Sequence, residues 1–246
     1  MISIQGVTKR YGRKTAVDDL TLEIAPGEFF AVLGPNGAGK TTTIKMVAGL
    51  LRPDSGRILV CGHDTATQLL AAKKVTAYVP DQPFLYDKLS GLEFMNFVAD
   101  LYEVDRTDRE REIGRLVELF SMKEFVRELT ESYSHGMKQR LVLAATLLHR
   151  PRAILVDEPL VGLDPHHARL VKEVFRDQAR GGVSILMSTH VLSVAEDFAD
   201  RIGIMLHGKI VALGGLEELR RASGGGGRLE EVFFRITGDR EPAAAG

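Results

Sequence analysis

A nine-residue stretch, GPNGAGKTT (Gly34–Thr42), constrains the fold of this chain more than any other feature of its 246 residues. It matches the pattern G-x-x-x-x-G-K-[ST] in full, and its glycines let successive backbone N–H groups turn inward around an anion. An apolar run, Glu28–Gly34, precedes it and a helical pattern, Lys40–Leu51, follows, so the positive end of that helix points at the same place. The sequence therefore predicts a strand–loop–helix unit that binds phosphate. Both flanks argue against a chance glycine-rich turn. Lys40 can reach the β- and γ-phosphates, and the Thr41 hydroxyl can bind Mg²⁺.

Short apolar runs alternate with helical patterns along much of the chain, which predicts an α/β fold with a largely parallel sheet. Two segments, Ile2–Val7 and Leu20–Ile24, alternate apolar and polar residues and are typical of antiparallel or edge strands. Further core strands are expected at Val75–Val79, Ala153–Asp157, Ser184–Ser188 and Arg201–Leu206.

The pattern changes between Pro83 and Pro151, where no strong strand is evident. Helical spacing occupies Leu92–Leu101, Thr107–Phe120 and Gly136–Leu148. We therefore expect residues 1–84 and 151–222 to form one core and residues 85–150 to form a helical subdomain inserted into it. Residues 223–246 are expected to be a flexible linker, SGGGG, and a tail. Within that tail, Arg228–Gly238 could form a short amphipathic helix.

The composition excludes several classes of protein. Lys and Arg number 32 against 33 Asp and Glu, so no overall basic field attracts nucleic acid or an acidic membrane surface. The single cysteine, Cys61, cannot form an internal disulfide, and we expect it to be a small buried apolar residue. The N-terminus lacks the apolar core of a signal peptide, and no apolar run approaches the roughly 20 residues of a spanning helix. Any membrane role therefore requires a partner that supplies the membrane segments.

Two adjacent acids, Asp157 and Glu158, stand at the end of the predicted strand Ala153–Asp157. Asp157 ends that strand at the carboxyl edge of the sheet, where ligands collect in open α/β folds, and is placed to hold Mg²⁺. Glu158 is one residue further on and can act as general base on an attacking water. Alone, the pair could be two solvated acids, but the phosphate loop upstream favours the catalytic interpretation. His190, at the end of another strand, could touch a γ-phosphate or orient Glu158.

The order of these motifs resembles that of the ATP-binding subunits of ABC transporters over nearly the whole chain. It runs through an aromatic loop with Tyr11, the Walker A motif Gly34–Thr42 and a Q-loop region VPDQ (Val79–Gln82). A signature YSHGM (Tyr133–Met137), the Walker B motif with its glutamate, a D-loop (Gly162–Asp164) and the switch histidine His190 complete it. The resemblance implies a RecA-like P-loop NTPase core with an antiparallel β subdomain and the inserted helical subdomain.

The resemblance also implies a role for each matching residue. Tyr11 would stack on adenine; the less favoured alternative is an ordinary strand-end aromatic residue. Asp157 would bind Mg²⁺, Glu158 would polarise water, and His190 would sense the γ-phosphate. Asp164 would shape the interface between two subunits. ATP would be bound by Tyr11 and by the whole phosphate loop: Gly34, Pro35, Asn36, Gly37, Ala38, Gly39, Lys40, Thr41 and Thr42.

In such proteins two copies pair head to tail, and each ATP lies between one Walker A motif and the opposite signature. Ser134, His135 and Gly136 would therefore bind the other subunit's ATP, while Ser134 also caps its own helix. His135 departs from the family's usual glycine, and it could favour phosphate or strain the approach. In the Q-loop, Asp81 stands where the usual Gln is expected and Gln82 follows it. Either could support Mg²⁺ and the lytic water.

Subfamily features point to one branch. Tyr133–Ser134, PFLYDKLSGLEF (Pro83–Phe94) and LEEVFFRITG (Leu229–Gly238) look like those of export-type ATPase subunits for drugs, antibiotics, lipids or ions. Phe84, Leu85 and Phe94 are either contacts for a membrane permease or core residues. The resemblance thus implies an ATPase on the cytoplasmic face of the membrane, partnered by a permease and a second ATPase subunit, without nucleic acid.

Two other functions remain as alternatives. A soluble ABC ATPase acting on ribosomes or DNA would carry two ATPase units or long coiled coils, and neither is evident here. Another P-loop enzyme, a kinase or GTPase, would not need the Asp-Glu pair with a D-loop and switch histidine. A GTPase would also show an N-K-x-D guanine-binding motif, which this sequence lacks.

Overall fold

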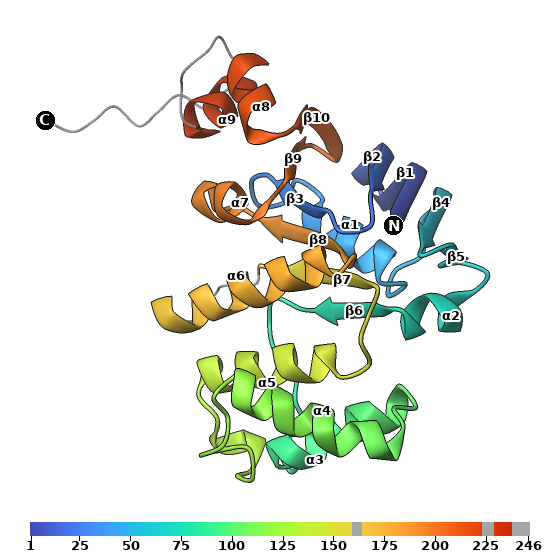
Figure 1. Ribbon diagram of the computed structural model, residues 1–246. Coiled ribbons are helices and arrows are strands. Elements are labelled where there is room, and N and C mark those ends of the chain that lie inside the picture. The colour runs from blue at the N-terminus through green and yellow to red at the C-terminus, as the bar shows by residue number, and fades with distance from the viewer. Residues whose placement is uncertain (159–163, 223–228, 238–246) are drawn as a thin grey trace, which may run out of the picture.

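The computed structural model describes residues 1–158, 164–222 and 229–237. Its larger sheet has six strands in the order β10-β9-β3-β8-β7-β6 (Figure 1). The five strands from β9 to β6 pair in parallel, and β10 pairs antiparallel with β9. Their bounds are β3 Phe29–Leu33, β6 Thr76–Val79, β7 Ala153–Asp157, β8 Ser184–Thr189, β9 Arg201–Leu206 and β10 Lys209–Gly214. The predicted α/β fold with a largely parallel sheet is confirmed.

The smaller sheet is antiparallel, in the order β2-β1-β4-β5. It comprises β1 Ile2–Tyr11, β2 Lys14–Ile24, β4 Ser55–Val60 and β5 His63–Asp64. Helix α1 (Lys40–Val47) lies between the two sheets and shares a core with both (Figure 1). The helix ends earlier than predicted, because Gly49 adopts a left-handed φ of 65° and Leu50 N donates to the Lys45 carbonyl. That is a Schellman stop.

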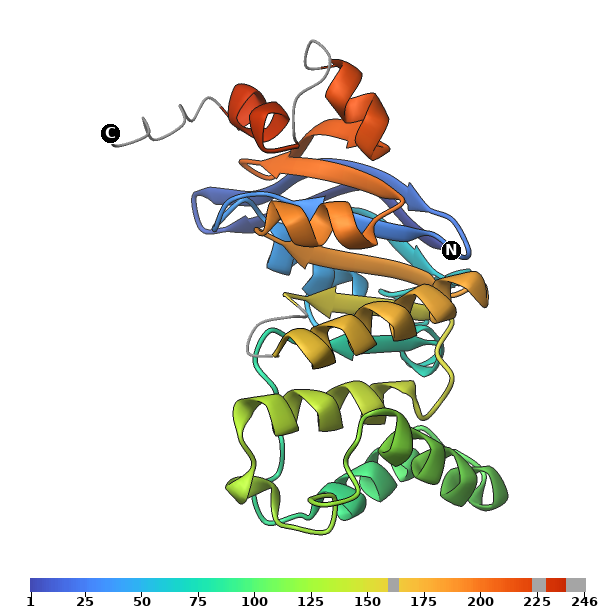
Figure 2. The same ribbon diagram turned by 60° about the vertical axis from the view of Figure 1, so that its left-hand side comes forward.

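Strand β3 explains why the large sheet has a core on each face. Phe30 and Val32 belong to the apolar cluster shared with α1, whereas Phe29, Ala31 and Leu33 belong to the cluster on the other face. Helices α6 (Pro165–Arg180) and α7 (Leu192–Phe198) cover that second face (Figure 2). The Phe29 ring contacts Phe175 of α6 and Phe198 of α7 at centroid distances of 6.3 and 5.5 Å. A continuous apolar strand is what two covered faces require.

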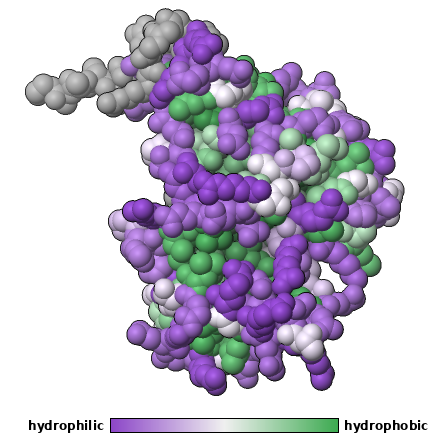
Figure 3. All heavy atoms as spheres, viewed as in Figure 1, coloured by the Kyte–Doolittle hydropathy of each residue, from purple (hydrophilic) through white to green (hydrophobic). Residues whose placement is uncertain are grey.

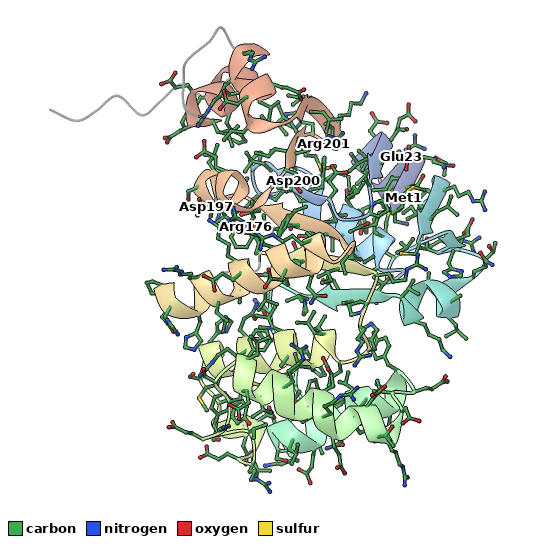
Figure 4. The ribbon with its side chains drawn as sticks, viewed as in Figure 1. Met1, Glu23, Arg176, Asp197, Asp200 and Arg201 are labelled. Atoms are coloured by element: carbon green, nitrogen blue, oxygen red, sulfur yellow. The ribbon has the colours of Figure 1, made fainter. Side chains whose placement is uncertain are left out.

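Polar contacts fix the connection from α7 into β9. Arg176 of α6 donates to the Asp197 carbonyl at 2.8 Å, and both residues lie side by side in Figure 4. The Asp200 carboxylate accepts from Phe29 N at 2.8 Å, and Arg201 pairs with Glu28 at 2.8 Å. These contacts hold the first residues of β3 and β9 in register.

Three of the remaining helices belong to the segment between β6 and β7. Helices α3 (Gly91–Leu101), α4 (Arg106–Leu119) and α5 (His135–Leu147), with the 3₁₀ turn η1 (Thr130–Ser132), lie together beyond β6 (Figure 1). They confirm the three predicted helices. Between residues 83 and 151 the structure contains no strand, all of those residues being described. Helices α2 (Leu69–Lys74), α8 (Leu216–Ala222) and α9 (Leu229–Thr237) complete the fold.

Several predictions about the ends of elements can now be assessed. Helix α9 confirms the helical prediction for the tail within residues 229–237, while SGGGG and the last nine residues lie outside the described part. Cys61 was expected to be buried, and this prediction was wrong. The residue is half-buried, because it occupies the β4–β5 turn with a left-handed φ of 51°. Within the described ranges, no helix combines the length and apolar character needed to span a membrane.

Candidate active site

A cavity of about 510 Å³ opens where the phosphate loop meets the carboxyl ends of β7 and β8. That volume is typical of a pocket for a small molecule or cofactor. Its lining draws together segments far apart in the sequence: Tyr11, Lys14, Ala16, Asn36, Gly37, Gly39, Lys40, Thr41, Thr42, Asp81, Asp157, Glu158 and His190. Most of the residues predicted from the sequence to bind the nucleotide or act on it therefore surround one space.

The phosphate loop requires glycine at two positions for different physical reasons. Gly39 has a φ of 112°, and a Cβ there would lie 2.3 Å from the Ala16 carbonyl oxygen. A Cβ on Gly34 would lie 2.3 Å from the Met205 carbonyl oxygen. The loop is thus pressed against β2 and β9, and only glycine allows that close approach.

Lys40 lies at the centre of this loop. Its ammonium donates to the carbonyl oxygens of Gly34 at 2.7 Å and Pro35 at 3.1 Å. Burial lowers the pKa of Lys40, while the nearby Glu158 and Asp157 carboxylates act to raise it. Three loop residues do not line the cavity: Gly34, Pro35 and Ala38. The carbonyl oxygens of Gly34 and Pro35 instead accept hydrogen bonds from the Lys40 ammonium.

Asp157 ends β7 and is almost fully buried, with 2% of its surface exposed. Its Oδ1 accepts from the Thr41 hydroxyl at 3.1 Å and from the Ser188 hydroxyl. Thr41 and Asp157 thus bring a hydroxyl and a carboxylate together at the start of α1. These hard oxygen donors fit Mg²⁺, which binds proteins through one or two such groups and takes its other ligands from phosphates and water.

Glu158 follows at once and has a left-handed φ of 52°, which is uncommon for a residue with a side chain. Its Oε1 lies 2.8 Å from Nδ1 of His190, and its Oε2 accepts from the Thr189 hydroxyl at 3.3 Å. The structure therefore places His190 against Glu158, one of the two positions expected from the sequence. A strained backbone that aims a carboxylate into a cavity is characteristic of functional sites.

The β1–β2 hairpin also contributes to the lining of the cavity. Tyr11, about half exposed, ends β1 and pairs in register with Lys14, the first residue of β2. Lys14 and Ala16 were not predicted as site residues, and only the hairpin register places them beside Tyr11. In the Q-loop, Asp81 lines the cavity and Gln82 does not.

The signature residues lie apart from this cavity, on α5. Ser134 caps α5, and its hydroxyl accepts from Met137 N at 3.3 Å. His135 is exposed beside it, and Gly136 is half-buried. None of the three lines the cavity. The preceding Tyr133 is buried and donates to the Phe125 carbonyl at 2.7 Å, which fixes the approach to the helix.

Asp164 begins α6. One of its oxygens accepts from the backbone N–H groups of His166 and His167, and the other lies 2.5 Å from Nδ1 of His167. These hydrogen bonds, that of the His167 side chain above all, lower the pKa of Asp164 to about 2. Gly162, at the start of the predicted D-loop, lies outside the described residues.

Comparison with known proteins identifies the family. The model of the family described as ABC transporter matches residues 17–161, more than half of the chain. The chain belongs to the ABC transporter family. Within it, the chain is an ATP-binding subunit and an ATPase, as the order of its motifs implied.

Relatives of this ABC protein extend over almost its full length. The daunorubicin resistance ATP-binding protein DrrA3 of Streptomyces coeruleorubidus is 37% identical over 99% of this chain and 77% of its own. The linearmycin resistance ATP-binding protein LnrL of Bacillus subtilis is 33% identical over 92% of this chain and 72% of its own.

Solved structures confirm the P-loop NTPase fold of this ABC subunit. A structure described as the ATP-binding subunit of an ABC transporter superimposes with a TM-score of 0.91 at 31% identity, covering 96% of this chain and 99% of that one. The ATP-binding cassette MJ0796, in a dimeric post-hydrolysis state with ADP and Pi, gives a TM-score of 0.80 at 23% identity. It covers 88% of this chain and 99% of that one, and shows the shared fold.

Proposed function

We propose that two such subunits, copies of this chain or of a related one, close head to tail around ATP and thereby drive a membrane permease. The observation that supports this most is the separation of the site into two parts. The cavity holds the phosphate loop, Asp157, Glu158 and His190, whereas the capped start of α5 with Ser134 lies outside it. The positive end of a helix is a favourable place for an anion, and a second subunit would bring Ser134 and this helix start to the phosphate.

The residues of the cavity divide the chemistry among them. Tyr11 stacks on the adenine, and the loop from Gly34 to Thr42 surrounds the phosphates with N–H groups and the Lys40 ammonium. Thr41 and Asp157, with Asp81 or Gln82, would hold Mg²⁺, which when bound neutralises phosphate charge. Glu158 orients the attacking water and accepts its proton, while His190 holds the Glu158 carboxylate in place.

The proposed contact with the permease lies beside the inserted helices. Phe84 is 75% exposed, and its ring meets Tyr86, whose ring in turn meets Phe97. Leu85 and Phe94 are core residues instead, each 8% exposed. Apolar residues also gather between α6 and the helices α3 to α5 on the face seen in Figure 3. The motion of residues 85–150 against a core of residues 1–84 and 151–222 would carry closure to the permease.

The relatives support an export role. Both named relatives are resistance proteins, for daunorubicin and for linearmycin. We infer that this subunit powers export of a drug, antibiotic, lipid or ion, from a peripheral position on the cytoplasmic face of the membrane. Neither the match to ABC transporters nor these relatives favours a role on ribosomes or DNA.

Two substitutions test the proposed dimer. Glu158→Gln should abolish turnover yet let ATP trap a dimer, which size-exclusion chromatography with and without ATP would detect. Hydrolysis at the unsubstituted rate would refute the assignment of Glu158 as general base.

Ser134→Arg should block hydrolysis while each subunit still binds ATP. Ser132→Arg is the matched control, because Ser132 is also exposed but lies just before the signature, and its hydroxyl donates to the Leu129 carbonyl. Loss of ATP binding by the isolated Ser134→Arg subunit would instead place Ser134 in its own subunit's fold.

A further inference from the structure

A second lysine, Lys14 on the β1–β2 hairpin, lines the nucleotide cavity. Lys14 is the first residue of β2, and Tyr11 is its partner across the hairpin. Its side chain is exposed and belongs to the cavity lining together with Tyr11 and Ala16. The neighbouring Arg13 is also exposed and also positively charged, but it does not line the cavity.

Lys14 differs from the other lysines nearby in what its ammonium contacts. Lys9 pairs with Asp54 at 2.8 Å, and Lys40 donates to two loop carbonyls. Among the residues that the structure describes, the Lys14 ammonium has neither a hydrogen bond nor an ion pair. Because Lys14 lines the cavity, its three donors are available to an anion bound there.

The order of groups along the cavity indicates what Lys14 meets. Tyr11 marks the end that takes the base, and Glu158 with His190 marks the end that takes the γ-phosphate. Lys40 and Thr41 stand at the start of α1, in the phosphate loop. Lys14 starts opposite Tyr11 and two residues before Ala16, whose carbonyl abuts Gly39 of the phosphate loop, so its four-carbon side chain can reach the junction of ribose and phosphates. A lysine ammonium binds a phosphate oxygen as a point charge.

We propose that Lys14 donates to the α-phosphate of the bound nucleotide and is a second lysine of the ATP site. This assignment rests on the proposed nucleotide site and adds a residue to it. Because ADP and ATP share the α-phosphate, the contact strengthens the binding of both equally. It also gives the adenine end of the cavity a fixed positive charge, complementing Lys40 at the centre.

Isothermal titration with ADP and with a non-hydrolysable ATP analogue tests the assignment. Lys14→Ala should raise both dissociation constants by about threefold to tenfold, the same factor for each ligand, and Lys14→Arg should restore most of the affinity. Arg13→Ala is the matched control and should leave both constants unchanged. In ATPase assays the loss should appear in KM rather than in kcat.

Salt gives a readout that a merely structural role would not move. The dissociation constant of Lys14→Ala divided by that of the unsubstituted protein should decrease when the salt concentration is raised from about 50 mM to about 500 mM. Salt screens an exposed contact between a charge and a phosphate and so weakens it.

Three results would overturn the inference: a Lys14→Ala constant equal to that of Arg13→Ala, a loss confined to the ATP analogue, or a ratio that salt does not change. If the unsubstituted protein bound no ADP, the proposed nucleotide site itself would be refuted. Lys40→Ala shows how large the loss of ADP affinity is when the phosphate site is removed.

Discussion

The backbone of Glu158 provides a test of whether this site stores strain for catalysis. Its φ of 52° lies in the left-handed region, which costs an ordinary residue about 1–2 kcal/mol. Glycine escapes that cost but loses about 0.5–1 kcal/mol through the greater entropy of the unfolded chain. Glu158→Gly should therefore be more stable than Glu158→Ala by about 0.5–1 kcal/mol.

Comparing the two variants with each other isolates the backbone. Both lack the carboxylate, so both lose the contacts to His190 and Thr189 to the same extent. The difference should appear as a higher urea midpoint and as a melting temperature about 1–4 °C higher for the glycine variant. Both variants should lose at least about a hundredfold in ATPase rate, as the proposed general-base role of Glu158 requires.

A matched pair at Glu173 should give the opposite sign. Glu173 is exposed in the middle of α6, where glycine is about 1 kcal/mol less favourable than alanine. Glu173→Gly should thus be the less stable of that pair. If Glu158→Gly were no more stable than Glu158→Ala, while the Glu173 pair behaved as expected, stored backbone strain at Glu158 would be refuted.

Three further substitutions test other parts of the structure. Gly39→Ala should destabilise the fold by about 2–4 kcal/mol and abolish nucleotide binding, since its Cβ would meet the Ala16 carbonyl at 2.3 Å; an unchanged urea midpoint would contradict this. Burial lowers the pKa of His149 to about 4 from an ordinary 6.5, so protonation favours the unfolded chain and stability should fall between about pH 6.5 and 4. In His149→Phe the urea midpoint should depend less on pH over that range. An unchanged dependence of the midpoint on pH would exclude His149 as the cause. Tyr133→Phe should cost about 1 kcal/mol in urea unfolding through loss of the bond to the Phe125 carbonyl, whereas no loss would show that this bond is replaced by water.

The parts of the fold that local pattern specifies strongly were predictable. Strands β3 and β7 are continuous apolar runs, and each ends next to a motif that fixes its direction. The start of α6 was recognisable as well, since Asp164 caps it and Pro165 is its first residue, although no helix was predicted there. Strands β4 and β10 are partly exposed, and their sequences, SGRILV and KIVALG, do not alternate apolar and polar residues.

The site was predictable to the extent that its residues belong to contiguous motifs. Lys14 was not predictable in this way, because only the register of the β1–β2 hairpin places it beside Tyr11. The choice between Asp81 and Gln82 depends on how a loop turns, which local sequence does not determine. Here the structure turns Asp81 to the cavity. The left-handed backbone of Glu158 likewise follows from its tertiary setting rather than from its residue type.

The geometry indicates which step of catalysis depends on the second subunit. Glu158 is already aimed into the cavity and held by His190, and Asp157 already contacts Thr41. The proposed general base and the proposed Mg²⁺ donors are thus already arranged in a single chain, so we expect nucleotide binding not to need a partner. The capped start of α5 with Ser134 is the group that has no access to this cavity. In the proposed dimer, pairing adds the start of α5 to a site whose general base, Glu158, is already in place. Hydrolysis therefore requires closure of the dimer, whereas nucleotide binding does not.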